Sequence, residues 1–435
     1  MGYSVYGFSI VFVFLIAYSI FHAIKSRGLT HSSAGVNNYV STSSYLVLIG
    51  TALVFIYLSG LRNAFLYYSP GSDSDLFIRF LDMIINGQSS RTFEIYLASN
   101  KQAFLNILAP VYHYIDAGGL ASIILLITLN LVFITMITRR LVYFAHGQDK
   151  NIFHCLVVLC PLAAMLMTSY LRDIFAVFLV IEIAYLIHKR VFNPATIGLI
   201  VLFSVLLFFT RSFYLLTLYL GVLVSIFSLR FVIIASIPLV LAVVLFIDIK
   251  PILVKLLVLH GRDAAKLGSS ALAVGADGIG DITPLFFVKR LVLGLFTMLV
   301  TPQPAFILND IVNSKGDWYR DVENVFQLLF SILYMGFILP ITATIVVSME
   351  KGTLAKFKAS RFHFAMFTVL VFLFVVYSLK YFGVRHYKVE YARYILWLAV
   401  LTFFPISSYL KTRVFFVFSS TMLIAAYLVT FFVVL

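Results

Sequence analysis

The residues best suited to chemistry are two arginines and an aspartate that stand between long apolar stretches. Arg172 and Asp173 interrupt LMTSYLRDIFAVFLVIEIAYLIHKR, and Arg211 interrupts LLFFTRSFYLL further along the chain. A single arginine that snorkels to a membrane surface is the plain explanation of either one. Because both arginines border apolar runs at one predicted depth, the lining of an anion-binding site explains them better.

Three more ionisable side chains qualify for chemistry. Asp75 lies in SDSD beside Asp73. Such an acidic pair holds a metal in nucleotide-sugar transferases, but a helix cap with a solvated face is the better interpretation, and no metal site is expected. His113 lies between two tyrosines, which indicate interfacial anchoring, with a general base as the alternative. Glu182 lies about 15 Å deep in its apolar run, where a structural hydrogen bond is favoured over a proton relay.

The composition indicates what kind of element must position these residues. Of 435 residues, 62% are hydrophobic and 11% are charged, against about 25% charged in ordinary domains. Apolar runs of roughly 20 residues can cross about 30 Å of hydrocarbon as helices. We therefore predict an all-α, polytopic integral membrane protein. The net charge of +14 then indicates basic cytoplasmic loops rather than a nucleic-acid partner.

About 12 transmembrane helices are predicted in a single transmembrane domain, residues 1–435. They cover residues 3–24, 42–61, 117–138, 152–170, 174–188, 194–210, 212–229, 231–249, 325–349, 362–382, 394–410 and 414–435. The connections after alternate spans are rich in Lys and Arg and contain only two acids, Asp149 and Glu350. Positive-inside bias puts these connections in the cytoplasm and both termini outside. The stretch 285–308 is predicted as an interfacial or re-entrant element.

Three long outer segments, 62–116, 250–324 and 383–393, are predicted to form the active-site face. The first contains PGSDSDLFIRFLDMIINGQ, in which apolar residues recur at helical spacing and Gly87 follows the end. This pattern predicts a short amphipathic helix that lies along the bilayer surface. The stretch 251–273 has a similar pattern. Cys155 and Cys160 are spaced for neither a disulfide nor a metal site.

Four stretches resemble the bacterial polysaccharide polymerases, namely the Wzy-type O-antigen and EpsG-like exopolysaccharide polymerases. SYLRDIFAVFLVIEIAYLI is similar to the arginine-started span of that group, and RSFYLLTLYLG is similar to its second polar-started span. EYARYILWLAVLTFFP resembles its late Arg-Tyr span, and PLFFVKRLVLGLFTMLVTPQPAF resembles its element ending in a Pro-x-Pro turn. The group's second polar-started span often opens with a histidine, where Arg211 stands here.

This resemblance implies a GT-C-like fold and a glycosyltransferase without a nucleotide cofactor. The implied donor and acceptor are glycans on undecaprenyl pyrophosphate, joined on the periplasmic face of the inner membrane. Membrane lipids and a chain-length regulator protein are the other expected partners. Four arginines are expected around the leaving pyrophosphate, because guanidinium groups bind phosphate oxygens in bidentate fashion. They are Arg172, Arg211, Arg290 and Arg393.

A base must take the proton of the incoming sugar hydroxyl. The candidates, in order of preference, are Asp173, Asp75, His113 and Glu390; Asp173 has the competing role of orienting Arg172. Two other classes fit the pattern. A lipid-phosphate-dependent glycosyltransferase would add a single sugar, and the SDSD segment could supply its outer-loop acid. A flippase or secondary transporter would require inverted repeats with matched broken helices, and no convincing repeat is found.

Overall fold

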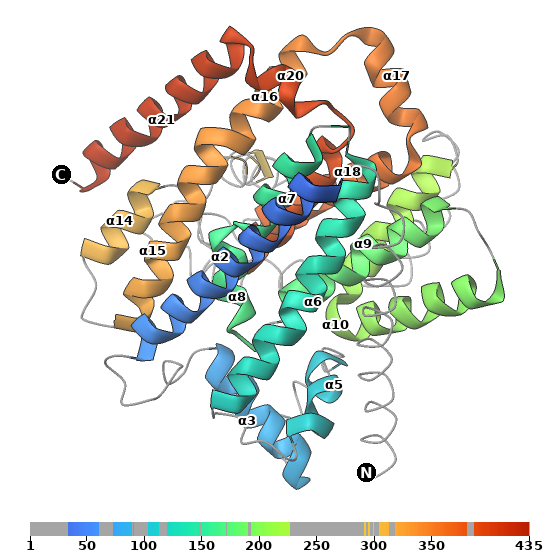
Figure 1. Cartoon of the computed structure of the whole chain (residues 1–435), viewed down its shortest axis with the longest axis vertical. Coiled ribbons are helices and arrows are strands. Elements are labelled where there is room, and N and C mark those ends of the chain that lie inside the picture. The colour runs from blue at the N-terminus through green and yellow to red at the C-terminus, as the bar shows by residue number, and fades with distance from the viewer. Residues whose placement is uncertain are drawn as a thin grey trace, which may run out of the picture. The chain divides into compact units, whose positions relative to one another are not determined.

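The computed structural model describes residues 34–60, 73–88, 90, 103–112, 120–145, 147, 149–170, 172–189, 193–226, 291, 292, 295, 299, 304–312, 318–380 and 387–434. The described residues form mainly helices (Figure 1). The helices are α2 (Ala34–Gly60), α3 (Asp73–Asn86), α5 (Ala103–Tyr112), α6 (Leu120–Phe144), α7 (Asp149–Val158), α8 (Pro161–Met167), α9 (Asp173–Lys189), α10 (Pro194–Ile226), α14 (Pro304–Val312), α15 (Trp318–Leu333), η3 (Tyr334–Ile338), α16 (Leu339–Ser348), α17 (Lys351–Ala359), α18 (Arg361–Lys380), α19 (Tyr387–Leu401), α20 (Ile406–Leu410) and α21 (Arg413–Val434).

The chain divides into two compact units. Unit 1 comprises Met1–Leu216, Pro304–Ser348 and Leu401–Leu435, and unit 2 comprises Thr217–Gln303 and Met349–Val400. Helix α10 passes from unit 1 into unit 2. The division into two units rests on contacts within the chain and does not test whether residues 1–435 form a single transmembrane domain. That stays a prediction.

Four helices in the described part of the chain are long and apolar enough to cross a membrane. They are Ala121–Phe144, Pro194–Ile226, Asp321–Ser348 and Arg361–Ser378. A fifth results if α7 and α8 form one bent span. The described regular elements are all helices, and some of them are long and apolar. Both features are consistent with the predicted α-helical membrane protein. The figure of about 12 spans stays a prediction, because 3–24, 231–249 and most of 285–308 fall outside the described residues.

Two predicted spans are broken by proline. The span predicted over 152–170 consists of α7 and α8, which meet at an angle of 46°. Pro161 is the first residue of α8 and has no N–H for the preceding turn. The span predicted over 394–410 ends as α19 at Leu401, and α20 begins after Pro405. The helix is interrupted at both places, and the prolines explain the breaks; α7 and α8 still qualify together as one bent span.

Helix α15 buries a row of polar residues and exposes apolar residues on another face. Asn324, Gln327 and Ser331, which we call the α15 polar stripe, are buried. Three apolar residues on another face of the same helix are exposed; they are Val325, Leu329 and Ile332. Such an arrangement is unfavourable in water and suits a helix whose outer face contacts lipid. Exposed apolar side chains on α2, α16 and α21 extend this pattern in unit 1.

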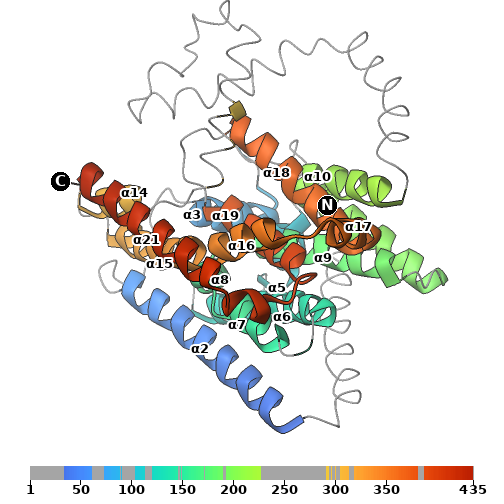
Figure 2. The same cartoon turned by 90° about the horizontal axis from the view of Figure 1, so that it is seen from above.

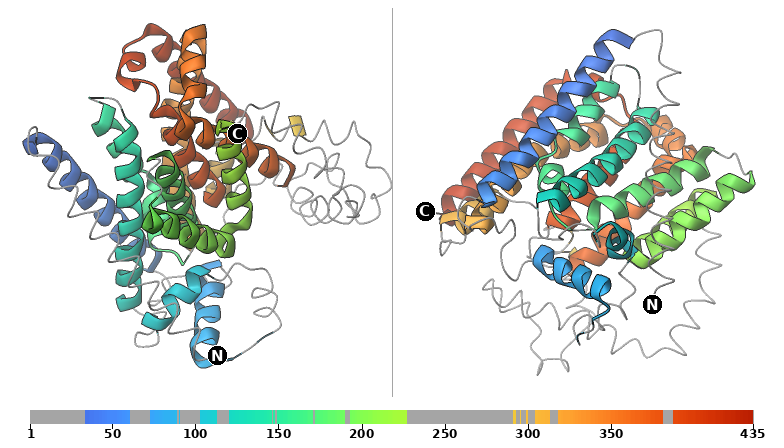
Figure 3. Two further views of the ribbon diagram at one scale, coloured as in Figure 1. Left: turned by 90° about the vertical axis from the view of Figure 1, so that its right-hand side faces the viewer. Right: turned by 60° about the horizontal axis from the view of Figure 1, so that its bottom comes forward.

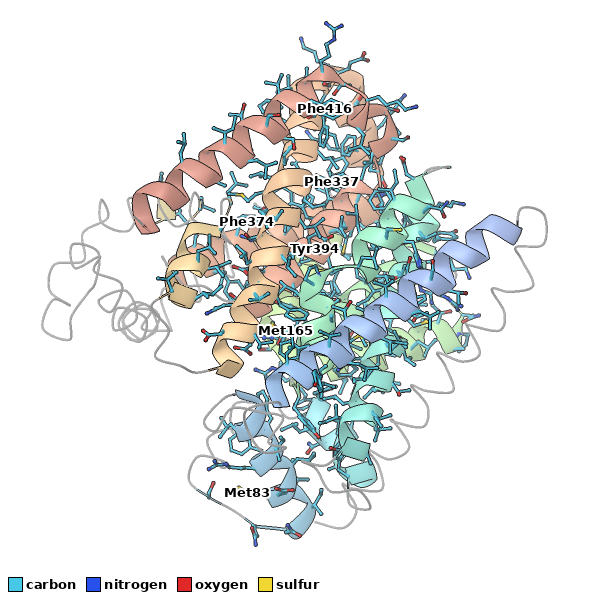
Figure 4. The ribbon with its side chains drawn as sticks, turned by 60° about the vertical axis from the view of Figure 1, so that its left-hand side comes forward. Met83, Met165, Phe337, Phe374, Tyr394 and Phe416 are labelled. Atoms are coloured by element: carbon cyan, nitrogen blue, oxygen red, sulfur yellow. The ribbon has the colours of Figure 1, made fainter. Side chains whose placement is uncertain are left out.

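A π-helical turn, η3, joins α15 to α16 in one candidate span, and α21 packs beside it. Ser419 of α21 donates a hydrogen bond to the Gly336 carbonyl, with 2.8 Å between Oγ and O. The Phe337 ring, which is labelled in Figure 4, meets Phe415 edge-on, with centroids 6.0 Å apart. Helix α14 lies beside the C-terminal end of α21 (Figures 1 and 2). A hydroxyl and close packing at glycine therefore join two apolar helices.

Helix α9 is the central helix of unit 1, because every residue from Asp173 to Leu186 is buried. Aromatic rings join it to its neighbours. Phe133 of α6 stacks on Phe178 at 4.8 Å between centroids, and Phe104 of α5 lies 5.5 Å from Phe175. A helix that is apolar around its whole circumference is expected to be buried on all sides. This packing fixes where the first residue of α9 lies.

The predicted amphipathic helix exists as α3, with Gly87 in the left-handed region (φ 64°) after its end. The N–H of Gln88 donates to the Met83 carbonyl at 3.0 Å, which is the Schellman closure. The position of α3 along a bilayer surface stays a prediction. Phe80 packs against Leu105 of α5, and α3 and α5 together occupy one end of α6 (Figure 3).

Unit 2 contains the end of α10 together with α17, α18 and α19. Helices α10 and α18 approach closely at Gly221, where an added Cβ would lie 2.8 Å from the Ala365 carbonyl oxygen. Trp397 of α19 meets Phe374 of α18 edge-on at 5.6 Å. Glycine at this contact permits the helices to approach, as in membrane helix pairs generally.

Candidate active site at the start of helix α9

The turn between α8 and α9 is held by polar contacts from neighbouring helices. Asn130 of α6 donates its side-chain N–H to the Met167 carbonyl at 3.1 Å, which satisfies an acceptor at the end of α8. The Tyr170 hydroxyl donates to Ser122 Oγ at 3.0 Å, and the Tyr112 hydroxyl donates to the Ser122 carbonyl at 2.7 Å. All of these groups are buried. The turn is therefore a fixed support for Arg172 and Asp173.

Asp173 is the first residue of α9, and its side chain forms an ion pair with Arg211. The pair joins Asp173 Oδ1 to an Arg211 terminal nitrogen, with 2% and 20% of the two side chains exposed. The Arg172 carbonyl accepts the Ala176 N–H at 2.9 Å, so Arg172 is the N-cap. The positive end of the helix dipole also favours a carboxylate at this position.

The second carboxylate oxygen of Asp173 has a different environment. Asp173 Oδ2 is buried and accepts no hydrogen bond from any residue that the structure describes. A buried carboxylate oxygen without a donor costs free energy, and a ligand with a hydroxyl group would satisfy it. Asp173 therefore has one carboxylate oxygen bonded to Arg211 and a second oxygen able to accept a proton.

Arg211 lies at the break in α10. Its backbone has φ −152° and ψ 76°, outside the helical region, while the residues on either side are helical. The predicted boundary between spans 194–210 and 212–229 therefore falls at the residue where helical geometry stops. Tyr214 is buried one turn later, with its ring centroid 5.8 Å from Arg211 Cζ. The break turns the guanidinium toward α9.

Glu182 belongs to a second ion pair further along α9. Arg140 of α6 binds it in bidentate fashion, with Nε–Oε1 at 2.7 Å and Nη2–Oε2 at 3.0 Å. The Tyr185 ring lies beneath the guanidinium, with its centroid 3.8 Å from Cζ. Both oxygens of this carboxylate are hydrogen-bonded, so the structural role favoured for Glu182 fits better than a proton relay. Arg140 was missed, because its neighbour Arg139 and the basic loop made both look like cytoplasmic charges.

The structure brings together some of the predicted site residues. Arg172, Asp173 and Arg211 lie in unit 1, the last two in contact. Asp173 pairs with Arg211, and its competing role of orienting Arg172 stays a prediction. Glu390 and Arg393 are both buried in α19 of unit 2, three residues apart and so on one helix face.

The positions of the other candidate side chains lie outside the described part of the structure. Asp75 is part of α3, but its side chain is outside the described part. His113 and Arg290 lie outside the described residues, as does the stretch 251–273. Within the described ranges, no three His, Cys, Asp or Glu side chains gather closely enough to hold a metal ion. Cys155 and Cys160 are both free thiols.

The site thus consists of a buried carboxylate and a guanidinium at a helix start, in a helical protein with apolar outer faces. Comparison of the chain with protein-family models, with curated proteins and with solved structures finds no match in any of the three. Its function must therefore be argued from the residues themselves.

Proposed function

We propose that the protein is a membrane glycosyltransferase that polymerises oligosaccharide repeat units carried on undecaprenyl pyrophosphate. The proposed site faces the periplasm from a bacterial inner membrane. The proposed product is O-antigen or exopolysaccharide. The observation that carries the proposal is the Asp173–Arg211 pair at the buried start of α9. The four stretches that resemble polysaccharide polymerases support the same substrate.

The proposed reaction transfers a glycan from one lipid carrier to another. The bond between the sugar anomeric carbon and the pyrophosphate oxygen breaks, and the acceptor hydroxyl oxygen bonds to that carbon. The bonding electrons leave with undecaprenyl pyrophosphate, whose charge Arg211 and Arg172 would stabilise. Arginine suits this role because it stays charged and offers paired donors to phosphate oxygens.

In this mechanism Asp173 takes the proton that the acceptor hydroxyl loses. Oδ2 is the atom that accepts it, because Oδ1 is held by Arg211. The ion pair also fixes the direction of the carboxylate, and a positioned base typically contributes about 10²–10⁴-fold to a rate. Glu390 as a base candidate and Arg393 as a pyrophosphate ligand belong to unit 2 and stay predictions.

The test is to incubate the purified protein with an undecaprenyl-pyrophosphate-linked repeat unit and no nucleotide sugar. The proposal predicts a ladder of products that differ by one repeat unit. A single added sugar that depends on a lipid-monophosphate donor would identify the lipid-phosphate-dependent glycosyltransferase instead. Unchanged substrate, with protein that remains folded, would contradict both enzyme proposals.

A transporter of lipid-linked oligosaccharides is the third candidate, after the lipid-phosphate-dependent glycosyltransferase, and one observation favours it. Helical geometry is interrupted between α7 and α8, and again at Arg211 in α10. Interrupted helices near charged residues are common at transporter binding sites. Reconstitution in vesicles distinguishes the two, because a transporter moves the lipid-linked unit between leaflets without lengthening it.

A further inference from the structure

Helix α17 connects two candidate membrane spans and carries three lysines. The first span ends at Ser348 and the second begins at Arg361. Within α17, the exposed basic residues are Lys351, Lys356 and Lys358, which we call the lysine surface. Glu350, just before the helix, is the single acidic residue between the two spans. A short helix between two spans stays at the level of the lipid headgroups.

One aromatic side chain holds α17 in place. Phe357 is the buried residue of this helix, and its ring contacts Phe364 and Phe367 of α18 at centroid distances of 6.4 and 5.9 Å. Ser360 ends α17, and its carbonyl accepts the Phe364 N–H at 3.0 Å at the start of α18. The lysine surface is therefore presented on a fixed support rather than on a loose loop.

Most of the surface of α17 is exposed. Apart from Phe357 and the half-buried Thr353, its residues from Lys351 to Ala359 are exposed. Leu354, 42% exposed, lies between the lysines on the face that carries Lys351 and Lys358. Positive side chains around an exposed leucine match the boundary between phosphate headgroups and acyl chains.

We propose that the lysine surface of α17 is a binding site for anionic phospholipid headgroups of the adjacent leaflet. The phosphates of such lipids accept hydrogen bonds from the exposed ammonium groups, and Leu354 enters the upper acyl region. The inference does not depend on the proposed glycosyltransferase activity, since it concerns a different surface with a different ligand.

The test compares lipid binding by the purified full-length protein and by two charge-matched variants, with phosphatidylglycerol and phosphatidylethanolamine as probes in native mass spectrometry. One variant is K351Q/K356Q/K358Q. The control is K150Q/K189Q/K411Q, which removes the same charge from exposed lysines elsewhere. Each lysine near an anionic surface contributes about 1 kcal/mol, or about fivefold in affinity. We expect phosphatidylglycerol binding to fall by on the order of a hundredfold in the first variant, and by less than about threefold in the control.

Two results would overturn the proposal. One is equal binding of the two lipids by the wild-type protein, and the other is an equal loss in the control variant. If the triple variant does not fold, K358Q alone and a salt titration of the wild-type protein decide the matter. Binding at the lysine surface must weaken as salt screens the charges, and salt-independent binding would refute it.

Discussion

At the scale of residues, two carboxylates on α9 each meet an arginine from a neighbouring helix. Asp173 meets Arg211 and Glu182 meets Arg140. Transfer of charges out of water costs several kcal/mol per ion, so a buried ion pair adds little net stability, although the loss of one partner is costly. The two pairs differ in one respect. Both oxygens of Glu182 are bonded to Arg140, whereas Asp173 Oδ2 has no donor within the described part of the chain.

The Arg140–Glu182 pair is predicted to be replaceable as a unit. Glu182→Leu alone leaves a buried guanidinium and should lower the free energy of unfolding by about 3–5 kcal/mol. Arg140→Met with Glu182→Leu removes both charges and should recover most of that loss. Unfolding in denaturing detergent measures both. A double variant that is no more stable than Glu182→Leu would contradict the structural role.

The Asp173–Arg211 pair is predicted to be coupled in stability. In a double-mutant cycle of Asp173→Asn and Arg211→Gln, the two changes together should cost about 1–3 kcal/mol less than their sum, because the second removes the partner already lost. The partial exposure of Arg211 keeps the value modest. Additive free energies of unfolding would mean that the contact contributes nothing.

Residue types alone identified Arg172, Asp173 and Arg211 as candidate site residues, because charged residues between long apolar runs are unusual. The partners were not predictable in the same way. Asp173 and Arg211 are 38 positions apart, and Arg140 and Glu182 are 42 apart. Each contact depends on which helices pack together, and one sequence contains no direct signal for that.

At the scale of elements, helix contacts depend on where glycine and small polar residues lie. Long apolar runs predicted most helices, and apolar residues at helical spacing predicted α3 with its end at Gly87. The breaks at Pro161 and Pro405 were not predicted. The spans were placed by hydropathy, which does not take into account that proline interrupts a helix. The buried polar stripe of α15 was also not predicted, because the span predicted over 325–349 rested on hydropathy and not on which face each residue occupies.

The two glycines of α10 are predicted to respond oppositely to a methyl group. Gly221→Ala brings a Cβ to 2.8 Å from the Ala365 backbone and should destabilise the protein by about 1–3 kcal/mol. Gly198→Ala meets nothing within 4 Å and should be neutral or stabilising by about 0.5–1 kcal/mol. Thermal unfolding of the two variants compares them. Equal effects would contradict the close approach of α10 and α18.

The α15 polar stripe contains a hydroxyl that can be removed. Ser331 Oγ is buried and has no hydrogen-bond partner among the described residues. Ser331→Ala removes this group without creating a large cavity, so we expect equal stability or a gain of about 1 kcal/mol. Melting temperature is the measurement. A loss above about 1 kcal/mol would mean that the hydroxyl has a partner, such as bound water.

At the scale of the whole molecule, an enzyme of lipid-linked glycans has to hold charge at a membrane boundary. The described helices expose leucine, valine and phenylalanine, while Asp173, Glu182 and Glu390 are buried. This distribution was predictable in kind from 62% hydrophobic and 11% charged residues. The GT-C-like fold, the membrane topology and the substrate stay predictions, because they depend on more than composition and periodicity.

The most direct test of the central claim compares two buried carboxylates of the same helix. Polymer formation from an undecaprenyl-pyrophosphate-linked repeat unit is measured for Asp173→Asn and Glu182→Gln, in amounts matched for folded protein. We predict that Asp173→Asn lowers the rate by about 10²–10⁴-fold, since it removes the proton acceptor, and that Glu182→Gln stays within about tenfold of wild type, because both oxygens of that carboxylate are already bonded to Arg140. A wild-type ladder from Asp173→Asn, or an equal loss in both variants, would contradict the claim.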